Sequence, residues 1–281
     1  MNIQLLSDLH LEAHPHFAAE PAPRADVLVL AGDIGSYQQG SLLDDGDFGL
    51  ARFSPLPQFA GWPTPVLFVP GNHEYDAQDF DEAHQRLRST CDRLGIAWLE
   101  RESLVLDGVR FVGTTLWTDF DALADHEGTT DIGRRLKMRD KAFRAANFYL
   151  RKTGGTRHGE PFLAEQMREQ GLLCQAWLAS ALATPFTGPT VAVTHFAPSL
   201  RSADPRYGLV PGTAGFCNAL DALLPQARLW LHGHLHAPSD YTVQGVQADG
   251  VPWSCRVAAN PLGYARKGEQ EQFQPGYCIT V

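Results

Sequence analysis

The sequence predicts a mixed α/β (α+β) fold in one domain spanning residues 1–281. Short apolar runs that stop abruptly at polar residues recur along the chain, which is typical of buried strands. Segments with apolar residues at helical spacing alternate with these runs. The composition, 44% hydrophobic and 20% charged residues, is that of a folded protein with a sizeable core.

Five apolar runs predict strands that each end next to a polar side chain able to bind a metal. Each run therefore ends in a possible ligand. The runs cover residues 3–6, 27–31, 66–69, 190–193 and 227–231.

The remaining elements follow from local signals. Phe80, Ala83, Leu87 and Leu94 form one apolar face of a helix over 79–94. Asp107-Gly108 supplies the positive φ angles of a tight turn between strands 103–106 and 109–115. The region 36–65, rich in Gly, Pro, Ser and Asp, predicts a long loop. We expect further helices over 162–182 and 215–224, and closing strands over 240–245, 251–259 and 277–281.

Charge and cysteine content narrow the class of protein. The net charge of −9 and the pI near 5.6 disfavour a protein that holds nucleic acid through overall positive charge. The five cysteines are scattered and never form a C-x-x-C pair, which suggests a reducing compartment. No secretory signal or membrane-length apolar run is present, so we expect a cytoplasmic protein without a membrane contact.

The N-terminal half carries three candidate metal-binding motifs. Asp8 and His10 form Asp-x-His, and residues two apart on a strand point the same way, although such pairs also occur on ordinary surfaces. Asp33 follows Gly32 and alone would suggest a turn. Asn72, His73 and Glu74 place an amide oxygen, an imidazole and a carboxylate directly after a strand.

The C-terminal half adds imidazoles. His195 follows a buried run and alone would suit either a core histidine or a ligand. His232, His234 and His236 put three imidazoles within five residues, with His234 and His236 on one side of an extended chain. A purely structural role for all three is a poor explanation.

Taken in order, Asp-x-His, Gly-Asp, Gly-Asn-His-Glu, His and Gly-His-x-His resemble the metallophosphoesterase superfamily, the calcineurin-like phosphoesterases, across most of the chain. The resemblance implies a four-layer sandwich of two mixed β-sheets flanked by helices, with a dinuclear metal centre at strand ends. It implies that Asp8, His10 and His236 hold one metal, that Asn72, His195 and His234 hold the other, and that Asp33 bridges the two.

The same resemblance implies a hydrolase of phosphodiesters or phosphomonoesters that acts on phosphorylated small molecules, with nucleotides among the candidates. A hydroxide bridging two divalent ions would attack phosphorus, and oxygen and nitrogen ligands fit Mn, Fe, Zn or Co. His73 would contact the phosphoryl group and protonate the leaving oxygen, or else orient a ligand. Glu74 would orient His73, hydrogen-bond a ligand or cap the helix that follows, and His232 would support the ligands from behind or have a structural role.

Departures from the motifs of two branches of the superfamily disfavour membership in those branches. Ile34-Gly35-Ser36-Tyr37 lacks the Gly-Asp-x-Val-Asp-Arg-Gly continuation of protein Ser/Thr phosphatases. Ser36 occupies the place of the iron-binding tyrosine of purple acid phosphatases. What remains resembles the bacterial branch with cyclic-nucleotide phosphodiesterases and broad-specificity phosphoesterases. The segment 260–264 is also similar to that branch and would either touch substrate or turn the chain.

A basic cluster over 134–157 stands out in an acidic chain. It predicts either a solvated helix face or a helical insertion around 118–165 that covers the metals and attracts an anionic substrate. Phe143, Phe148 and Tyr149 would stack on a base in the second case, but core packing is the simpler expectation.

Two other functions are compatible with this pattern. A nuclease would need a basic groove beside the metals, which the overall acidity disfavours. A scaffold that has kept the fold without chemistry would not need every ligand position and His73. Substrate-binding residues and oligomeric state are not specified by the motifs.

Overall fold

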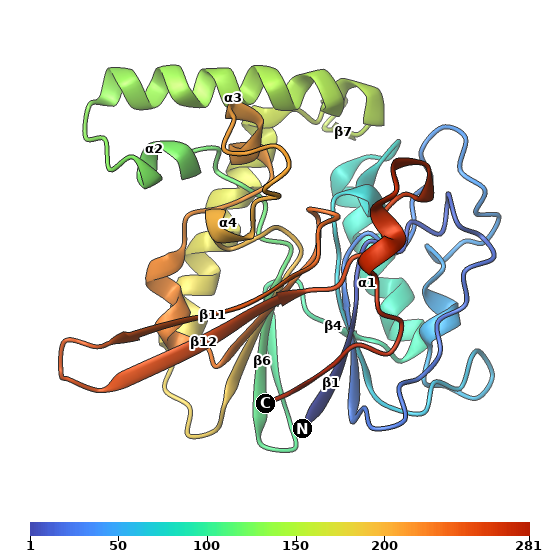
Figure 1. The fold of residues 1–281 in the computed structure, drawn as a ribbon. Coiled ribbons are helices and arrows are strands. Elements are labelled where there is room, and N and C mark those ends of the chain that lie inside the picture. Colours follow the sequence, from blue (N-terminus) through green and yellow to red (C-terminus); the bar gives the residue numbers. More distant parts are fainter.

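The molecule is built from two β-sheets packed face to face, each covered by helices on its outer side (Figure 1). This computed structural model describes residues 1–281. Helix α1 (Phe80–Leu94) lies outside the five-stranded sheet, and helix α4 (Ala164–Ala183) lies outside the six-stranded sheet. The predicted four-layer sandwich of two mixed sheets is confirmed.

Both sheets have a parallel centre, and the first has one antiparallel edge strand whereas the second has two. The first has the order β13-β1-β2-β3-β4, in which only β13 is antiparallel to its neighbour. Its strands are Asn2–Leu6, Val27–Ala31, Val66–Val69, Ala97–Trp98 and, for β13, Cys278–Thr280.

The second sheet has the order β11-β12-β10-β9-β6-β5, with antiparallel pairing of β11 with β12 and of β5 with β6. Strands β5 and β6 are Glu102–Leu106 and Val109–Thr114, joined by the expected Asp107-Gly108 turn. The others are β9 (Thr190–Thr194), β10 (Leu229–His232), β11 (Ser239–Val246) and β12 (Pro252–Ala259).

The apolar runs are continuous because both faces of the central strands are buried. On β1, Ile3 and Leu5 belong to an inner cluster of 16 buried residues contributed by both sheets. Leu6 faces the other way, into an outer cluster of 41 buried residues. Successive apolar side chains of a central strand therefore pack alternately against the other sheet and against the outer helices and loops.

Helix α1 shows how local sequence sets an element. Asp79 caps its N-terminus by accepting from the backbone N–H groups of Asp81 and Glu82, and Gly95 ends it in the left-handed conformation with φ of 68°. Phe80, Ala83, Leu87 and Leu94 are buried, as their spacing predicts. Helix α4 and strands β11, β12 and β13 also form close to their predicted positions.

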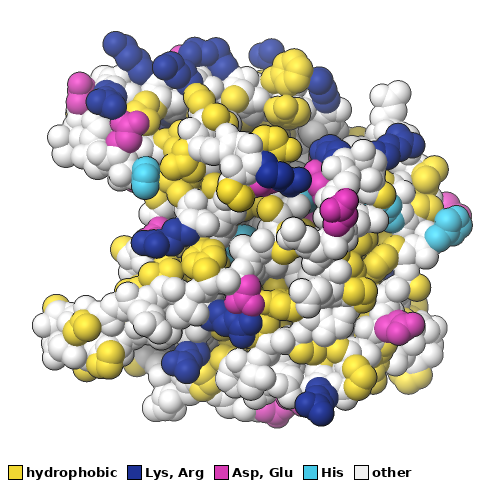
Figure 2. Space-filling view, viewed as in Figure 1, with side chains coloured by type: hydrophobic (Ala, Val, Ile, Leu, Met, Phe, Trp, Pro, Cys, Tyr) yellow, Lys and Arg dark blue, Asp and Glu magenta, His cyan; other side chains and the backbone are white.

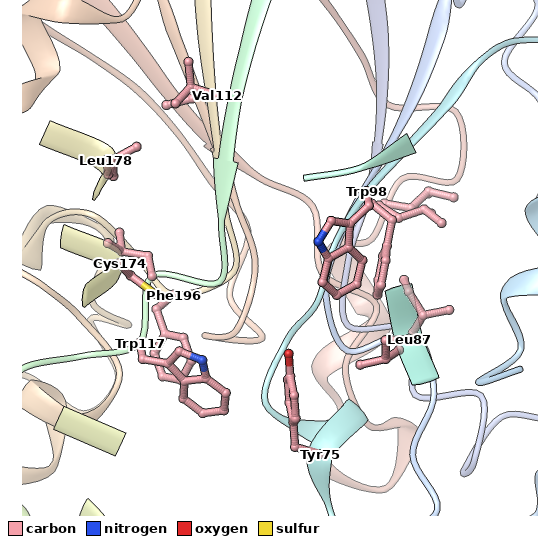
Figure 3. Packing of buried hydrophobic residues seen from close by; sticks show 14 of the residues in the cluster. Tyr75, Leu87, Trp98, Val112, Trp117, Cys174, Leu178 and Phe196 are labelled. Atoms are coloured by element: carbon pink, nitrogen blue, oxygen red, sulfur yellow. The ribbon is translucent and has the colours of Figure 1, made fainter. Parts of the chain in front are cut away.

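Aromatic side chains pack between the two sheets beneath the ends of the strands. Figure 3 shows Tyr75 and Trp98 facing Trp117 and Phe196 from the opposite side. The ring centroids of Tyr75 and Trp117 are 5.6 Å apart, and those of Trp117 and Phe196 are 5.4 Å apart. Since Tyr75 and Phe196 closely follow His73 and His195 in the chain, this packing anchors the loops that carry both histidines.

The basic cluster lies on helix α3 (Ile132–Thr153), which runs along the top of the molecule beside α2 (Ala122–His126) (Figures 1 and 2). Its Lys and Arg side chains gather on that surface. Phe143 packs against Phe120 with centroids 4.9 Å apart, as expected of a core residue. Phe148 and Tyr149 are 60% and 61% exposed, so their expected core packing is wrong, because they lie on the outward side of α3. A two-stranded hairpin, β7 (Thr156–Arg157) and β8 (Glu160–Pro161), follows.

The expected helix over 215–224 is wrong. Two 3₁₀ turns, Pro211–Gly215 and Asp221–Gln226, flank an irregular stretch. Within it, the N–H groups of Asn218 and Leu220 donate to the carbonyls of Ala197 and Pro198 rather than to a helix. Tertiary pairing thus replaces the local periodicity.

Further short 3₁₀ turns punctuate the loops. The long loop over 36–65 is present and contains one such turn at Leu50–Phe53. All five cysteines are free thiols, four of them buried. No helix combines the length and hydropathy needed to cross a membrane. The other short turns are His73–Tyr75, Leu200–Ser202, Ala265–Lys267 and Glu269–Gln272.

Candidate metal centre

All seven predicted metal ligands lie just beyond the C-terminal ends of five strands. In the first sheet, Asp8 and His10 follow β1, Asp33 follows β2 and Asn72 follows β3. In the second sheet, His195 follows β9, and His234 and His236 follow β10. Because these strands are parallel within each sheet, their carboxyl ends open on the same edge of the sandwich.

The side chains converge into two groups that share one carboxylate. One group contains Asp8, His10, Asp33 and His236, and the other contains Asp33, His195 and His234. Within each group the candidate ligand atoms lie within 4.8 Å of one another. The Oδ1 atom of Asn72 lies 3.2 Å from Nε2 of His195, which adds an amide oxygen to the second group.

In the first group, two imidazoles present the same kind of atom to each other. Nδ1 of His10 lies 2.9 Å from Oε1 of Glu12, and Nδ1 of His236 lies 2.7 Å from Oε2 of Glu269. Since each carboxylate accepts a hydrogen bond there, the Nδ1 atom carries hydrogen and the Nε2 atom faces inward. The two Nε2 atoms are 2.9 Å apart, and Nε2 of His236 is 3.5 Å from Oδ1 of Asp8.

The second group is oriented by backbone. Nδ1 of His195 donates to the carbonyl of Ala31 at 2.8 Å, which turns its Nε2 atom toward Oδ2 of Asp33 at 3.2 Å. Nδ1 of His234 lies 3.2 Å from the same Nε2 atom. The other ring nitrogen of His234 is buried without a hydrogen-bond partner.

These donors fit divalent metal ions. The two inward Nε2 atoms 2.9 Å apart and a buried unpartnered ring nitrogen suit a cation bound among them. Burial opposes ionisation of Asp33, yet the imidazoles of His195 and His73 hold its pKa well below the usual value. The shared group is therefore a carboxylate at neutral pH.

Five of the candidate ligands have strained backbone conformations at the strand ends. Asp8, His10, Asp33, His234 and His236 all have φ between 47° and 72°, a region that few non-glycine residues adopt. Gly71 allows a close approach as well, because a Cβ atom there would lie 2.2 Å from Oδ1 of Asp33. The local sequence is thus adapted to bring polar side chains together.

His73 lies at the mouth of this cluster, with 21% of its side chain exposed. Its backbone N–H donates to Oδ1 of Asp33 at 2.8 Å, and its Nδ1 atom lies 2.5 Å from Oδ2 of Asp76. Burial works against a charged ring, but the carboxylates of Asp76 and Asp33 raise the pKa of His73 well above its usual value. These two carboxylates therefore favour the protonated form of the imidazole.

Glu74 supports the loops instead of facing the cluster. Its carboxylate accepts from the backbone N–H groups of Asp33, Ile34 and Gly71. Burial and the nearby charge of Asp33 raise the pKa of Glu74 to about 8. Of the roles predicted for Glu74, these contacts fit hydrogen bonding to a candidate ligand, through the backbone of Asp33.

Two other polar residues lie behind the cluster. Nε2 of the buried His232 contacts the hydroxyls of Ser202 and Ser239, at 3.0 and 3.3 Å. The Asn260 amide donates to the carbonyls of Leu5 and Gln274 and so ties down the turn after β12.

Four residues that contact the clustered side chains were not identified from the sequence. Glu12 continues the two-residue spacing of Asp8 and His10, and Asp76 lies one helical turn after His73, so both had a local signal. Glu269 had none, because it lies 33 residues from His236. Tyr264 belongs to the segment 260–264 noted above, and its ring stacks on His10 at 4.2 Å.

The comparisons with known proteins agree with this arrangement. The family model described as calcineurin-like phosphoesterase matches residues 1–238. The molecule is therefore a metal-dependent phosphoric ester hydrolase. Because the match covers most of the sequence, including all seven candidate ligands and His73, the chain belongs to the calcineurin-like phosphoesterase family.

Two individual proteins are similar over nearly their whole length. An uncharacterized protein of Acanthamoeba polyphaga mimivirus is 23% identical, with 99% of this chain and 96% of the viral protein covered. The crystal structure of the phosphopantetheinyl hydrolase of Mycobacterium tuberculosis has a TM-score of 0.65 at 19% identity. That comparison covers 100% of this chain and 95% of the other and supports the shared fold.

Proposed function

We propose that this chain hydrolyses a phosphodiester or phosphomonoester of a small molecule at a dinuclear metal centre. The observation that carries the proposal is the position of Asp33 in both groups of ligand atoms. A carboxylate shared in this way suits two ions about 3.5 to 4 Å apart. Asp8, His10 and His236 would hold one ion, and Asn72, His195 and His234 the other, with Asp33 bridging.

The ligand types suit Mn, Fe, Zn or Co. When bound, two such ions neutralise phosphate oxygens and lower the pKa of an attacking water. The protein's own residues supply the rest. His73, held by Asp76 at the mouth of the cluster, is placed to hydrogen-bond the phosphoryl group and to protonate the leaving oxygen.

Helices α2 and α3 are proposed as a cover within a single domain spanning residues 1–281. The carbonyl of Thr153, at the end of α3, accepts from the N–H of Ala77, one residue after Asp76. Leu150 and Thr153 also line a small cavity together with Asn72. The basic surface of α3 would attract an anionic substrate such as a nucleotide toward this end of the sandwich.

The decisive experiment compares bis-p-nitrophenyl phosphate with p-nitrophenyl phosphate. Metal-free protein is reloaded separately with Mn, Fe, Co, Ni or Zn, and metal content is measured in the same samples. Turnover that depends on metal and disappears in Asp33→Asn supports the proposal. The ratio of diester to monoester hydrolysis then directs a second round with a cyclic nucleotide and, because of the solved neighbour, a phosphopantetheinyl ester.

The same assay separates the alternatives. Absence of turnover in protein that holds two ions per chain would contradict hydrolysis of these esters and favour a scaffold. A nuclease would instead cleave single- or double-stranded DNA, with binding that weakens steeply as salt increases. The net charge of −9 supports a small anionic substrate over a long polyanion.

A further inference from the structure

The segment 260–272 reaches back over the N-terminal part of the candidate metal centre, although the family match ends at residue 238. We call this segment the strap. It follows β12, contains the 3₁₀ turns Ala265–Lys267 and Glu269–Gln272, and leads to β13. In Figure 1 it is the red stretch at the upper ends of the first-sheet strands, near α1.

The strap is anchored to the backbone that carries Asp8. Leu262 donates its N–H to the carbonyl of Ser7 at 3.1 Å, and Gly263 donates to the carbonyl of Asp8 at 3.0 Å. Gly263 has φ of 68°, and a Cβ atom there would lie 2.7 Å from Cβ of Glu269 and 3.3 Å from Cβ of His236. Glycine therefore lets the strap fold tightly against the centre.

Glu269 connects the strap to His236. Its Oε2 atom lies 2.7 Å from Nδ1 of His236 and accepts from the backbone N–H of Tyr264 at 2.8 Å. The Glu269 side chain is only 9% exposed, so water competes weakly for this hydrogen bond. The contact determines which ring nitrogen of His236 faces Asp8 and His10.

Tyr264 covers the neighbouring imidazole. Its ring stacks on His10 with a centroid distance of 4.2 Å and an interplanar angle of 26°, and meets His236 edge-on at 5.3 Å. The second half of the centre is packed by different residues, since His234 lies against Phe196 with centroids 4.0 Å apart. The strap thus contacts the two imidazoles of one half.

We propose that Glu269 and Tyr264 are positioning residues that set the metal affinity of the half formed by Asp8, His10 and His236. The inference rests on the proposed two-metal function. It adds that the strap sets the metal affinity of one half of the metal centre. Removing the carboxylate takes away the hydrogen-bond partner of Nδ1 of His236, and removing the ring takes away the packing on one face of His10, so the donors are less ordered before any ion binds.

The test is titration of metal-free full-length protein with Mn²⁺ by calorimetry, with Co²⁺ absorbance as a second readout of ligand geometry. In Glu269→Ala we expect one of two affinities to fall about 10- to 100-fold while the other is unchanged. Glu269→Gln, whose amide oxygen can still accept from His236, should restore part of the loss. Glu271→Ala is the matched control, because Glu271 is exposed on the same 3₁₀ turn.

Tyrosine variants separate stacking from the hydroxyl. Tyr264→Phe should match the wild type, and Tyr264→Leu should weaken the same single affinity and alter the Co²⁺ spectrum. Wild-type affinities in both Glu269→Ala and Tyr264→Leu would overturn the inference. Equal loss of both ions together with a lower unfolding temperature would also overturn it, because that result indicates a general structural role.

Failure of the proposed function gives a different result. Wild-type protein that binds fewer than two ions per chain contradicts the dinuclear centre itself. Wild-type protein with two ions and metal-dependent turnover, combined with unaffected strap variants, contradicts only the role of the strap.

Discussion

Nδ1 of His73 lies 2.5 Å from Oδ2 of Asp76, three residues further along the chain. The carboxylate is 4% exposed, and the imidazole lies at the mouth of the centre. This pair resembles the relation of a general acid to the group that orients it. It therefore offers a way to impair proton transfer without removing any proposed metal ligand.

Asp76→Asn should lower kcat by about tenfold to a hundredfold. The neutral amide orients the His73 ring less firmly and does not stabilise its protonated form as the carboxylate does. Metal content, measured by mass spectrometry, should stay at the wild-type value. Asp44→Asn, at an exposed carboxylate, should change neither quantity. Loss of metal in Asp76→Asn would show that Asp76 supports the ligands.

Asp33→Asn and His73→Ala should fail in different ways. The first removes the shared carboxylate, so we expect loss of both ions or of their catalytic arrangement. The second should keep metal and reduce turnover by about a hundredfold or more if proton donation limits the rate. Measuring metal content and kcat on the same preparations separates the roles, and equal metal loss in both variants would refute them.

Gly71→Ala should damage the centre although it adds one methyl group. The new Cβ atom would lie 2.2 Å from Oδ1 of Asp33 and 2.6 Å from its backbone nitrogen, so the β2 and β3 loops must separate. We expect at least a tenfold weaker Mn²⁺ affinity by calorimetry. Gly46→Ala is the control, because a Cβ atom at Gly46 meets nothing within 4 Å. Similar affinities in both variants would contradict the close approach.

His84 should make stability depend on pH. Burial and the charge of Arg101 lower the pKa of His84 from 6.5 to about 4, so the folded state disfavours the protonated ring. The contribution of His84 to the free energy of unfolding is therefore complete above pH 6.5 and declines as the pH falls toward 4. Because the side chain is partly exposed, we expect a loss on the order of 1 kcal/mol at pH 5.

Urea unfolding at pH 7.5 and pH 5 measures this effect. His84→Gln should show a smaller decline in the free energy of unfolding than the wild type does. Other groups titrate equally in both proteins, so the difference between the two declines isolates His84. An identical decline would mean that protonation of His84 costs nothing in the folded state.

Much of the fold could be predicted because its signals are local. Strands β1, β2 and β3 are continuous apolar runs, and their burial on both faces explains why no alternation appears in the sequence. Asp79 and Gly95 delimit α1 through capping that depends only on neighbouring residues. Convergence of the seven candidate ligands could be predicted from the family resemblance, which places a metal centre at strand ends.

The remaining features depend on tertiary contacts. The stretch between Gly215 and Asp221 looks helical but bonds to Ala197 and Pro198, which are distant in sequence. Phe148 and Tyr149 look like core residues but lie on the outward side of α3. The contact of Glu269 with His236 requires a tight turn at Gly263, and no spacing rule links residues so far apart.

The pairing of β1 with β13 joins Asn2 to Thr280 and Gln4 to Cys278. During synthesis at about 5 to 20 residues per second, the first strand therefore waits on the order of tens of seconds for this partner to leave the ribosome. The strap emerges only shortly before that partner. A nascent chain accordingly exposes Asp8 and His10 for most of its synthesis, and its capacity to retain an ion in that half should develop last.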